Sequence, residues 1–344
     1  MKSNYLRYIL VACAAISAQL FSVLAADGPY HELKQISLRS GSPCTSLAID
    51  ETAQRLYAVR GNRIEVIDLN KDMPVGAVTE IQDIRGFTVA PNFHTGYASS
   101  GKLAAVGLVD LINLRMTAKM KTGQGPTAVL VEPSHMELYA LNPGNGSATI
   151  GEADDGDFLT NLDLGGVPAA LTADPTSAPD SKTSQVLCAL EDKDEIVAIN
   201  VAAHRIETRW PVAPGRGPAA MAFDRVNHRL LVACTNKTIL TMDPGSGKVL
   251  ATAPIGEDVG ECVFDPETQY IFVSGGDGTI TILHQDSPVQ LTVVQTLKTT
   301  PSAKAVALNL NNHRIYVAPG NSGFDDGGRP LAVSGKVGIL VFGR

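Results

Sequence analysis

The chain has 344 residues, of which 44% are hydrophobic and 18% are charged, so it carries enough apolar residues for a large buried core. Its formal net charge of −7 disfavours nucleic acid as the main partner, because an acidic chain repels phosphate at long range. The 32 glycines and 20 prolines suit a fold with many tight turns. The length would suggest about two domains, but all-β folds often hold such a length in one unit.

Residues 1–26 have the pattern of a cleaved secretory signal peptide. Positive charges precede a long apolar stretch that ends in small residues, which predicts cleavage after Ala25 or Ala26. Two alternatives stay open: an uncleaved anchor, because the apolar run is near membrane-spanning length, and lipid attachment at Cys13. We expect a periplasmic or secreted protein that has no transmembrane segment after signal cleavage. A single domain is then predicted over residues 27–344.

Four cysteines follow the signal segment, and the sequence cannot choose among their three possible pairings. The chain has no CxxC motif and no Cys/His cluster with zinc spacing. We therefore favour the interpretation that each cysteine is a small buried apolar residue in a strand over any disulfide. The four cysteines are Cys44, Cys188, Cys234 and Cys262.

Seven copies of one pattern fill the rest of the chain. Each copy has a short apolar strand that ends just before an anchor residue, and the anchors follow one another at intervals of 40, 42, 42, 50, 41 and 44 residues: Asp50, Ala90, Glu132, Asp174, Asp224, Asp265 and Asn309. A Ser/Thr/Pro-rich insert, PTSAPDSKTS, accounts for the longest interval and indicates an exposed loop.

A second and a third apolar strand follow each anchor, and a weaker fourth strand follows in most copies. The second strands read RLYAVR, TGYASS, ELYALN, QVLCAL, RLLVAC, YIFVSG and RIYVAP. Runs of β-branched and aliphatic residues between Gly/Asn/Asp/Pro clusters indicate strands. A repeat of about 42 residues with four strands is typical of propeller blades, which must stack to bury both faces. The predicted fold is an all-β, seven-bladed β-propeller with four-stranded antiparallel blades.

The two ends of the chain predict how the ring closes. The last copy stops after its third strand, KVGILVFGR, and an unassigned strand, YHELKQISL, precedes the first copy. We expect residues 30–38 to supply the missing outer strand of the last blade, since this pairing would remove exposed strand edges.

The repeat resembles the YVTN-repeat family of seven-bladed β-propellers, also described as DNA-binding-propeller-like extracytoplasmic proteins. The resemblance rests on RLYAV, ELYAL, RIYVA and EVIDL, and on the Gly-x-x-Pro approach in GQGPTAVLV and GRGPAAMAF; it covers about residues 30–344. WD40 propellers fit less well because the Trp-Asp pairs are absent. The resemblance implies the fold but no particular function.

One inner-strand position departs from the repeat. Four residues before the anchors, six copies have a tiny residue and the sixth copy has a carboxylate: Ser46, Gly86, Ala128, Ala170, Ala220, Glu261 and Ala305. One position earlier, Arg85 and Lys304 add two cations. We expect these three charges around the mouth of the central channel, as a polar pocket for an anionic or zwitterionic small ligand. The alternative is that Glu261 pairs with Lys304 and only ties blades together.

The loop GNSGFDDGGRPLAVSG in the last copy is the longest of its class. Long loops without structure of their own tend to be functional or disordered. Asp325, Asp326 and Arg329 could cap the channel or hold a cation through oxygen ligands, although the spacing is not that of an EF-hand. The alternative is that this loop only covers the protein surface or is disordered.

The sequence favours a binding role over catalysis. The six histidines in or after the turns are expected on the face opposite the pocket, and no Ser/His/Asp set converges on one face. We predict an exported, non-enzymatic, monomeric scaffold that recognises an unknown protein or small-molecule ligand on its loop face and channel mouth. We predict no cofactor, with a divalent cation in the channel as an open alternative. The other functions considered are a metal-dependent, lactonase-like hydrolase or lyase, and weak nucleic-acid binding.

Overall fold

A computed structural model describes residues 28–39, 41–174, 184–320 and 338–344. The signal segment, the PTSAPDSKTS insert up to residue 183, and the loop that holds Asp325, Asp326 and Arg329 lie outside these residues. The helices within the described ranges are three short 3-10 turns: η1 (Pro91–Phe93), η2 (Pro143–Asn145) and η3 (Glu191–Lys193). None of these helices is long and apolar enough to cross a membrane.

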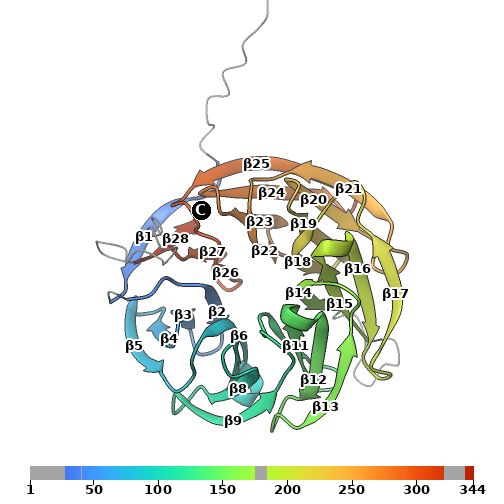
Figure 1. The fold of residues 1–344 in the computed structure, drawn as a ribbon. Coiled ribbons are helices and arrows are strands. Elements are labelled where there is room, and N and C mark those ends of the chain that lie inside the picture. The colour runs from blue at the N-terminus through green and yellow to red at the C-terminus, as the bar shows by residue number, and fades with distance from the viewer. Residues whose placement is uncertain (1–27, 40, 175–183, 321–337) are drawn as a thin grey trace, which may run out of the picture.

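The described strands form seven four-stranded antiparallel sheets arranged in a ring around a central axis (Figure 1). Blades 1 to 3, from inner to outer strand, are β2 (Ser46–Asp50), β3 (Arg55–Val59), β4 (Ile64–Asp68), β5 (Met73–Val78); β6 (Ile84–Ala90), β7 (Thr95–Ser100), β8 (Ala105–Asp110), β9 (Arg115–Lys121); and β10 (Val129–Glu132), β11 (Glu137–Asn142), β12 (Ser147–Glu152), β13 (Phe158–Asp163). Blades 4 to 6 are β14 (Pro168–Ala173), β15 (Gln185–Leu190), β16 (Glu195–Asn200), β17 (Arg205–Pro211); β18 (Pro218–Asp224), β19 (Arg229–Cys234), β20 (Thr238–Met242), β21 (Val249–Pro254); and β22 (Val259–Asp265), β23 (Tyr270–Gly275), β24 (Thr279–Ser287), β25 (Gln290–Lys298). The predicted seven-bladed β-propeller is confirmed.

Blade 7 joins the two ends of the chain. It runs from β26 (Val306–Asn309) through β27 (Arg314–Val317) and β28 (Gly338–Gly343) to β1 (His31–Ser37), which pairs antiparallel with β28 (Figure 1). Just before β1, the ring of Tyr30 packs edge-to-face on Phe272 of blade 6, with 4.9 Å between the ring centroids. The Tyr30 hydroxyl donates a hydrogen bond to the His313 carbonyl at 2.8 Å. The predicted closure by the N-terminal strand is therefore confirmed.

The apolar core lies between neighbouring blades. Clusters of buried residues join each blade to the next, such as the one that packs Tyr57 and Val66 of blade 1 against Ile84 and Val109 of blade 2. The second and third strands are almost wholly buried, whereas an outer strand such as β9 alternates exposed and covered residues. This pattern follows from the geometry, because a middle strand has a strand of its own blade on each side, whereas an outer strand borders solvent along one edge.

The repeated anchor residues stabilise the turns between first and second strands. The Asp224 carboxylate accepts hydrogen bonds from the N–H groups of Val226 and Asn227 at 2.9 and 3.1 Å, and Asp50 accepts one from the Ala53 N–H at 2.8 Å. This bonding to the local backbone is why Asp and Asn recur in turns. The residue that ends each of these turns has a positive φ of 50 to 59° in the six described copies: Gln54, His94, Met136, His228, Gln269 and His313.

Two turn histidines also tie blades together. The His228 Nε2 atom lies 2.9 Å from the Asp174 carboxylate of blade 4, and the His313 Nδ1 atom lies 2.7 Å from the Asp265 carboxylate of blade 6. In both cases, the histidine of one blade contacts the anchor residue of the preceding blade. These histidines therefore have a structural role at the turns, as their place in the repeat predicted.

The four described cysteines are free thiols. Cys188, Cys234 and Cys262 are buried in strands of blades 4, 5 and 6, and Cys44 is half-buried just before β2. The preferred interpretation as small buried residues in strands is confirmed for Cys188, Cys234 and Cys262, whereas Cys44 lies outside a strand and is only half-buried.

Candidate functional site

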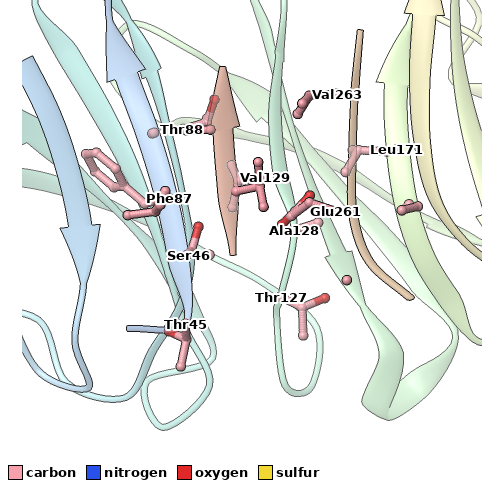
Figure 2. Close-up of a pocket in the computed structure, with 18 of the residues that line it drawn as sticks. Thr45, Ser46, Phe87, Thr88, Thr127, Ala128, Val129, Leu171, Glu261 and Val263 are labelled. Atoms are coloured by element: carbon pink, nitrogen blue, oxygen red, sulfur yellow. The ribbon is translucent and has the colours of Figure 1, made fainter. Parts of the chain in front are cut away.

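A cavity with a volume of about 560 Å³ lies inside the ring and is lined by the inner strands of the blades (Figure 2). Thr45 and Thr127 lie at one end of it, and Thr88 and Val263 lie further along it (Figure 2). Glu261 lies between these two levels (Figure 2). A cavity of this size is within the range that small-molecule sites occupy.

The size of the cavity follows from the tiny residues of the repeat. Five of the positions four residues before the anchors line it together with Glu261, and their side chains are small or missing: Ser46, Gly86, Ala128, Ala170 and Ala220. Large side chains at this level would fill the space on the axis. Glu261 is the one long side chain at this level of the lining.

A β-bulge sets the position of Glu261. The ladder between β22 and β23 pairs Val259 with Gly275 and then Cys262 with Val273, so two consecutive residues, of which Glu261 is the second, have no partner in β23. Bulges bend a strand locally and re-aim its side chains, and they are common next to binding sites. The irregular strand therefore directs this carboxylate into the cavity.

Ser274 holds the bulge in place. Its hydroxyl accepts a hydrogen bond from the Glu261 N–H at 2.8 Å and donates one to the Lys304 carbonyl of blade 7 at 2.6 Å. Gly260 is required beside it, since a Cβ atom there would lie 2.6 Å from the same Lys304 carbonyl. The backbone of Glu261 is thus fixed to two blades, while its carboxylate is left for the cavity.

Burial inside the ring raises the pKa of Glu261 to about 7. Glu261 is exposed to the space of the cavity, but the protein of the ring surrounds that space, which limits the hydration of the carboxylate. No hydrogen bond or ion pair from a described residue offsets this effect. The pKa of Glu261 is thus higher in the folded chain than in the unfolded chain, where it has the usual value of about 4.3. Protonation of Glu261 therefore favours the folded state. This stabilisation is present at acid pH and is lost as the pH rises through about 7.

Arg85 lies on blade 2, nearly across the ring from blade 6, and also lines the cavity. It is the bulged residue of β6, whose ladder with β7 shifts register between Ile84 and Gly86. Its guanidinium lies 3.2 Å from the Asp83 carboxylate, and both side chains are exposed. The charge of Arg85 at the mouth is therefore already compensated.

Lys304 is not among the residues that line the cavity. Its ammonium group forms an ion pair with Asp258, in the loop that leads into β22. The described contacts thus include no ion pair between Lys304 and Glu261, which was the structural alternative for this carboxylate. The structure brings Arg85 and Glu261 to one cavity and places Lys304 beside it.

Five other polar side chains on the loop face hold loops together. In five blades, an Asn or Asp of the turn between the second and third strands accepts a hydrogen bond from the backbone of a loop that leads into an inner strand. The distances are 2.8, 3.0, 2.6, 3.0 and 2.9 Å, respectively, for Asn62, Asn145, Asp192, Asn236 and Asp277. For Asp192, the hydrogen bond from the Val167 N–H lowers the pKa of the carboxyl. These groups are engaged in the fold rather than free for a ligand.

No family model matches this chain, and no curated protein matches it. The fold is therefore assigned from the seven sheets and their closure. The assignment to the YVTN-repeat family stays a prediction from the repeat pattern.

The described residues include no group of three or more His, Cys, Asp or Glu side chains that could hold a metal ion. Glu261 is the one carboxylate that lines the cavity within the described ranges. The other oxygen-bearing side chains of the lining are hydroxyls, which belong to Thr45, Ser46, Thr88 and Thr127.

Sequence reasoning missed Ser274 and its counterpart in blade 2, Ser99. Ser99 accepts a hydrogen bond from the Gly86 N–H at 2.9 Å and donates one to the Thr127 carbonyl. A signal was present: the fifth position of the second strand is serine only in these two copies, which are also the copies with Arg85 and Glu261. The serines therefore mark the two blades that bring charged side chains to the cavity.

Proposed function

We propose that this chain is an exported, non-enzymatic propeller of the YVTN-repeat kind that binds a small ligand in its central cavity. The observation that carries the proposal is the Glu261 carboxylate, which lines a cavity of about 560 Å³ with no partner among the described residues. Leaving a charge without a partner inside a protein costs stability, and such groups concentrate at functional sites. The signal-like segment 1–26 and the repeat pattern support export and the family assignment.

A cavity-filling variant tests the proposal. We expect protein from the periplasm or the medium to retain a small molecule in native mass spectrometry, or to gain one from a metabolite library. Ala170→Phe, on the cavity wall of blade 4, should weaken this binding by at least about tenfold, because the ring occupies the ligand's space.

Ala202→Phe is the matched control, since Ala202 is exposed in the turn between β16 and β17 of the same blade. Binding should be unchanged in this variant. Ligand binding that survives Ala170→Phe in a folded protein would place the site elsewhere. Chemical conversion of the bound molecule would show an enzyme instead of a binding protein. The mass of the intact chain also shows whether cleavage follows Ala25 or Ala26.

A further inference from the structure

We propose that the cavity binds a small organic ammonium ion, whose charged head pairs with the Glu261 carboxylate and whose carbon skeleton packs against the apolar wall. This inference rests on the proposed function, because it names the ligand class of the same cavity. Its physical basis is the sign of the uncompensated charge and the kinds of atoms that surround it.

The sign of the charge in the cavity is negative. Of the two ionisable residues that line it, Arg85 is compensated by Asp83 at 3.2 Å, whereas Glu261 has no partner among the described residues. A carboxylate of limited hydration gains the most from a cation, since the attraction is stronger there than in bulk water. An anionic ligand would have to approach this carboxylate without any free cation on the described wall.

The strands around Glu261 provide no competing cation. Its strand β22 packs against β18, β19 and β26 of the neighbouring blades and pairs with β23 of its own blade. These four strands read PAAMAFD, RLLVAC, VALN and YIFVSG. Their ionised side chains are Asp224 at the far end of β18, where Gln285 and turn amides bind it, and its strand partner Arg229, which pairs with Asp243. The nearest cation in sequence, Lys304, is paired with Asp258. Within the described ranges, no cation is therefore left to pair with Glu261, and a cationic ligand would provide the missing positive charge.

The surrounding atoms favour an organic cation over a metal ion. Calcium takes six to eight oxygen ligands, and magnesium demands a regular octahedron, but the described wall offers a single carboxylate and several hydroxyls. An ammonium group needs only acceptors for its three N–H donors, which a carboxylate and hydroxyl oxygens provide.

The remaining wall combines polar groups with apolar side chains, and the apolar side chains would contact the ligand's carbon atoms. It includes aliphatic side chains from all seven blades: Leu47, Ile49, Val89, Val129, Leu171, Met221, Val263 and Val306. Binding sites for small molecules commonly combine such a wall with a few polar groups that fix orientation. A primary alkylammonium ion matches this combination.

Calorimetric titration of the mature protein at pH 8.5 tests the proposal with n-butylammonium and n-hexylammonium as probes. We expect each ion to bind at least about tenfold more tightly than the alcohol of the same length, because only the ion carries the charge. Glu261→Gln should weaken ammonium binding by about 30-fold or more. Glu257→Gln is the matched control, since Glu257 is an exposed carboxylate of the loop before β22 and pairs with Lys237. The affinity of this variant for the ammonium ions should stay within about twofold of that of the wild type.

The pH provides a test that needs no variant, in case Glu261→Gln does not fold. With a Glu261 pKa of about 7, only the ionised fraction binds the cation. The affinity should therefore fall by about 30-fold from pH 8.5 to pH 5.5, while each bound ion displaces close to one proton at the lower pH.

Three results would overturn the proposal: no binding of either ammonium ion, equal binding of the alcohols, or tighter binding of pentanoate than of butylammonium. Saturable calcium binding that Glu261→Gln abolishes would also overturn it, in favour of a metal site. If another class of ligand still binds and Ala170→Phe blocks it, the cavity remains the binding site and only the ligand class is wrong. If Ala170→Phe has no effect on any ligand, the proposed function itself is wrong.

Discussion

A chain that begins at Arg39, and therefore lacks β1, is expected to melt about 10–20 °C below the mature protein. The truncation removes three buried apolar residues, Tyr30, Ile36 and Leu38, each of which contributes about 1.5–3 kcal/mol. It also removes the ladder between β1 and β28. In a domain of this size, one kcal/mol corresponds to a shift of roughly 2–4 °C or less in the melting temperature. Thermal unfolding followed by circular dichroism measures the effect.

The control for the truncation separates lost closure from damage at the new terminus. Tyr30→Ala with β1 present should lower the melting temperature less, since it removes the contacts of one side chain and leaves the ladder between β1 and β28 in place. A synthetic peptide of residues 28–39, added in trans, should restore part of the lost stability by pairing with β28. An unchanged melting temperature in the truncated chain would show that the ring is stable without its N-terminal strand.

Arg60→Met is expected to destabilise the protein by about 3–5 kcal/mol. The guanidinium of Arg60 and the carboxylate of Glu65 form an ion pair at 3.0 Å in blade 1, and both side chains are almost fully buried. Arg60 also donates hydrogen bonds to the carbonyls of Arg39 and Ser42, at 2.7 and 2.9 Å, in the connection from blade 7 to blade 1. Removing Arg60 leaves the Glu65 charge buried without its partner. Urea unfolding at pH 7 measures the loss.

The double variant Arg60→Met/Glu65→Met is the matched control for the ion pair. It removes both charges together, so it should recover most of the lost stability, apart from the bonds to the two carbonyls. If the double variant is as unstable as Arg60→Met alone, the bonds to the connection matter more than the charge. If Arg60→Met costs less than about 1 kcal/mol, the pair does not hold the connection.

The fold could be predicted because the repeat depends on interactions between residues that are close in sequence. An Asp recurs at the position of Asp224 in several copies, where the side chain must accept hydrogen bonds from N–H groups of the turn. A His recurs at the position of His228 in several copies, where the backbone has a left-handed φ. Such demands involve residues a few positions apart, so they recur in most copies of the sequence. The closure by β1 was also predictable, since one copy lacked an outer strand.

The site could be predicted only in part. Glu261 stood out because its counterparts in the other copies are tiny, and the structure does place it in the cavity. Its relation to Lys304 was not predictable, because the pairing of Lys304 with Asp258 depends on two loops from different blades. The bulge that positions Glu261 depends on Ser274, whose two hydrogen bonds join strands that are distant in sequence. Contacts between blades follow from the ring geometry, which a single repeat does not contain.

The most direct test of the cavity carboxylate is a pH titration of Glu261 by carbon-13 NMR, with the signal assigned by its absence in Glu261→Gln. We predict a midpoint near 7 in the free protein, since burial disfavours the charged form. Saturating butylammonium should move this midpoint to lower pH, because the cation stabilises the carboxylate. A midpoint near the usual value of about 4.3, unmoved by the ammonium ion, would contradict both the limited hydration of Glu261 and its role as the ligand's counter-charge.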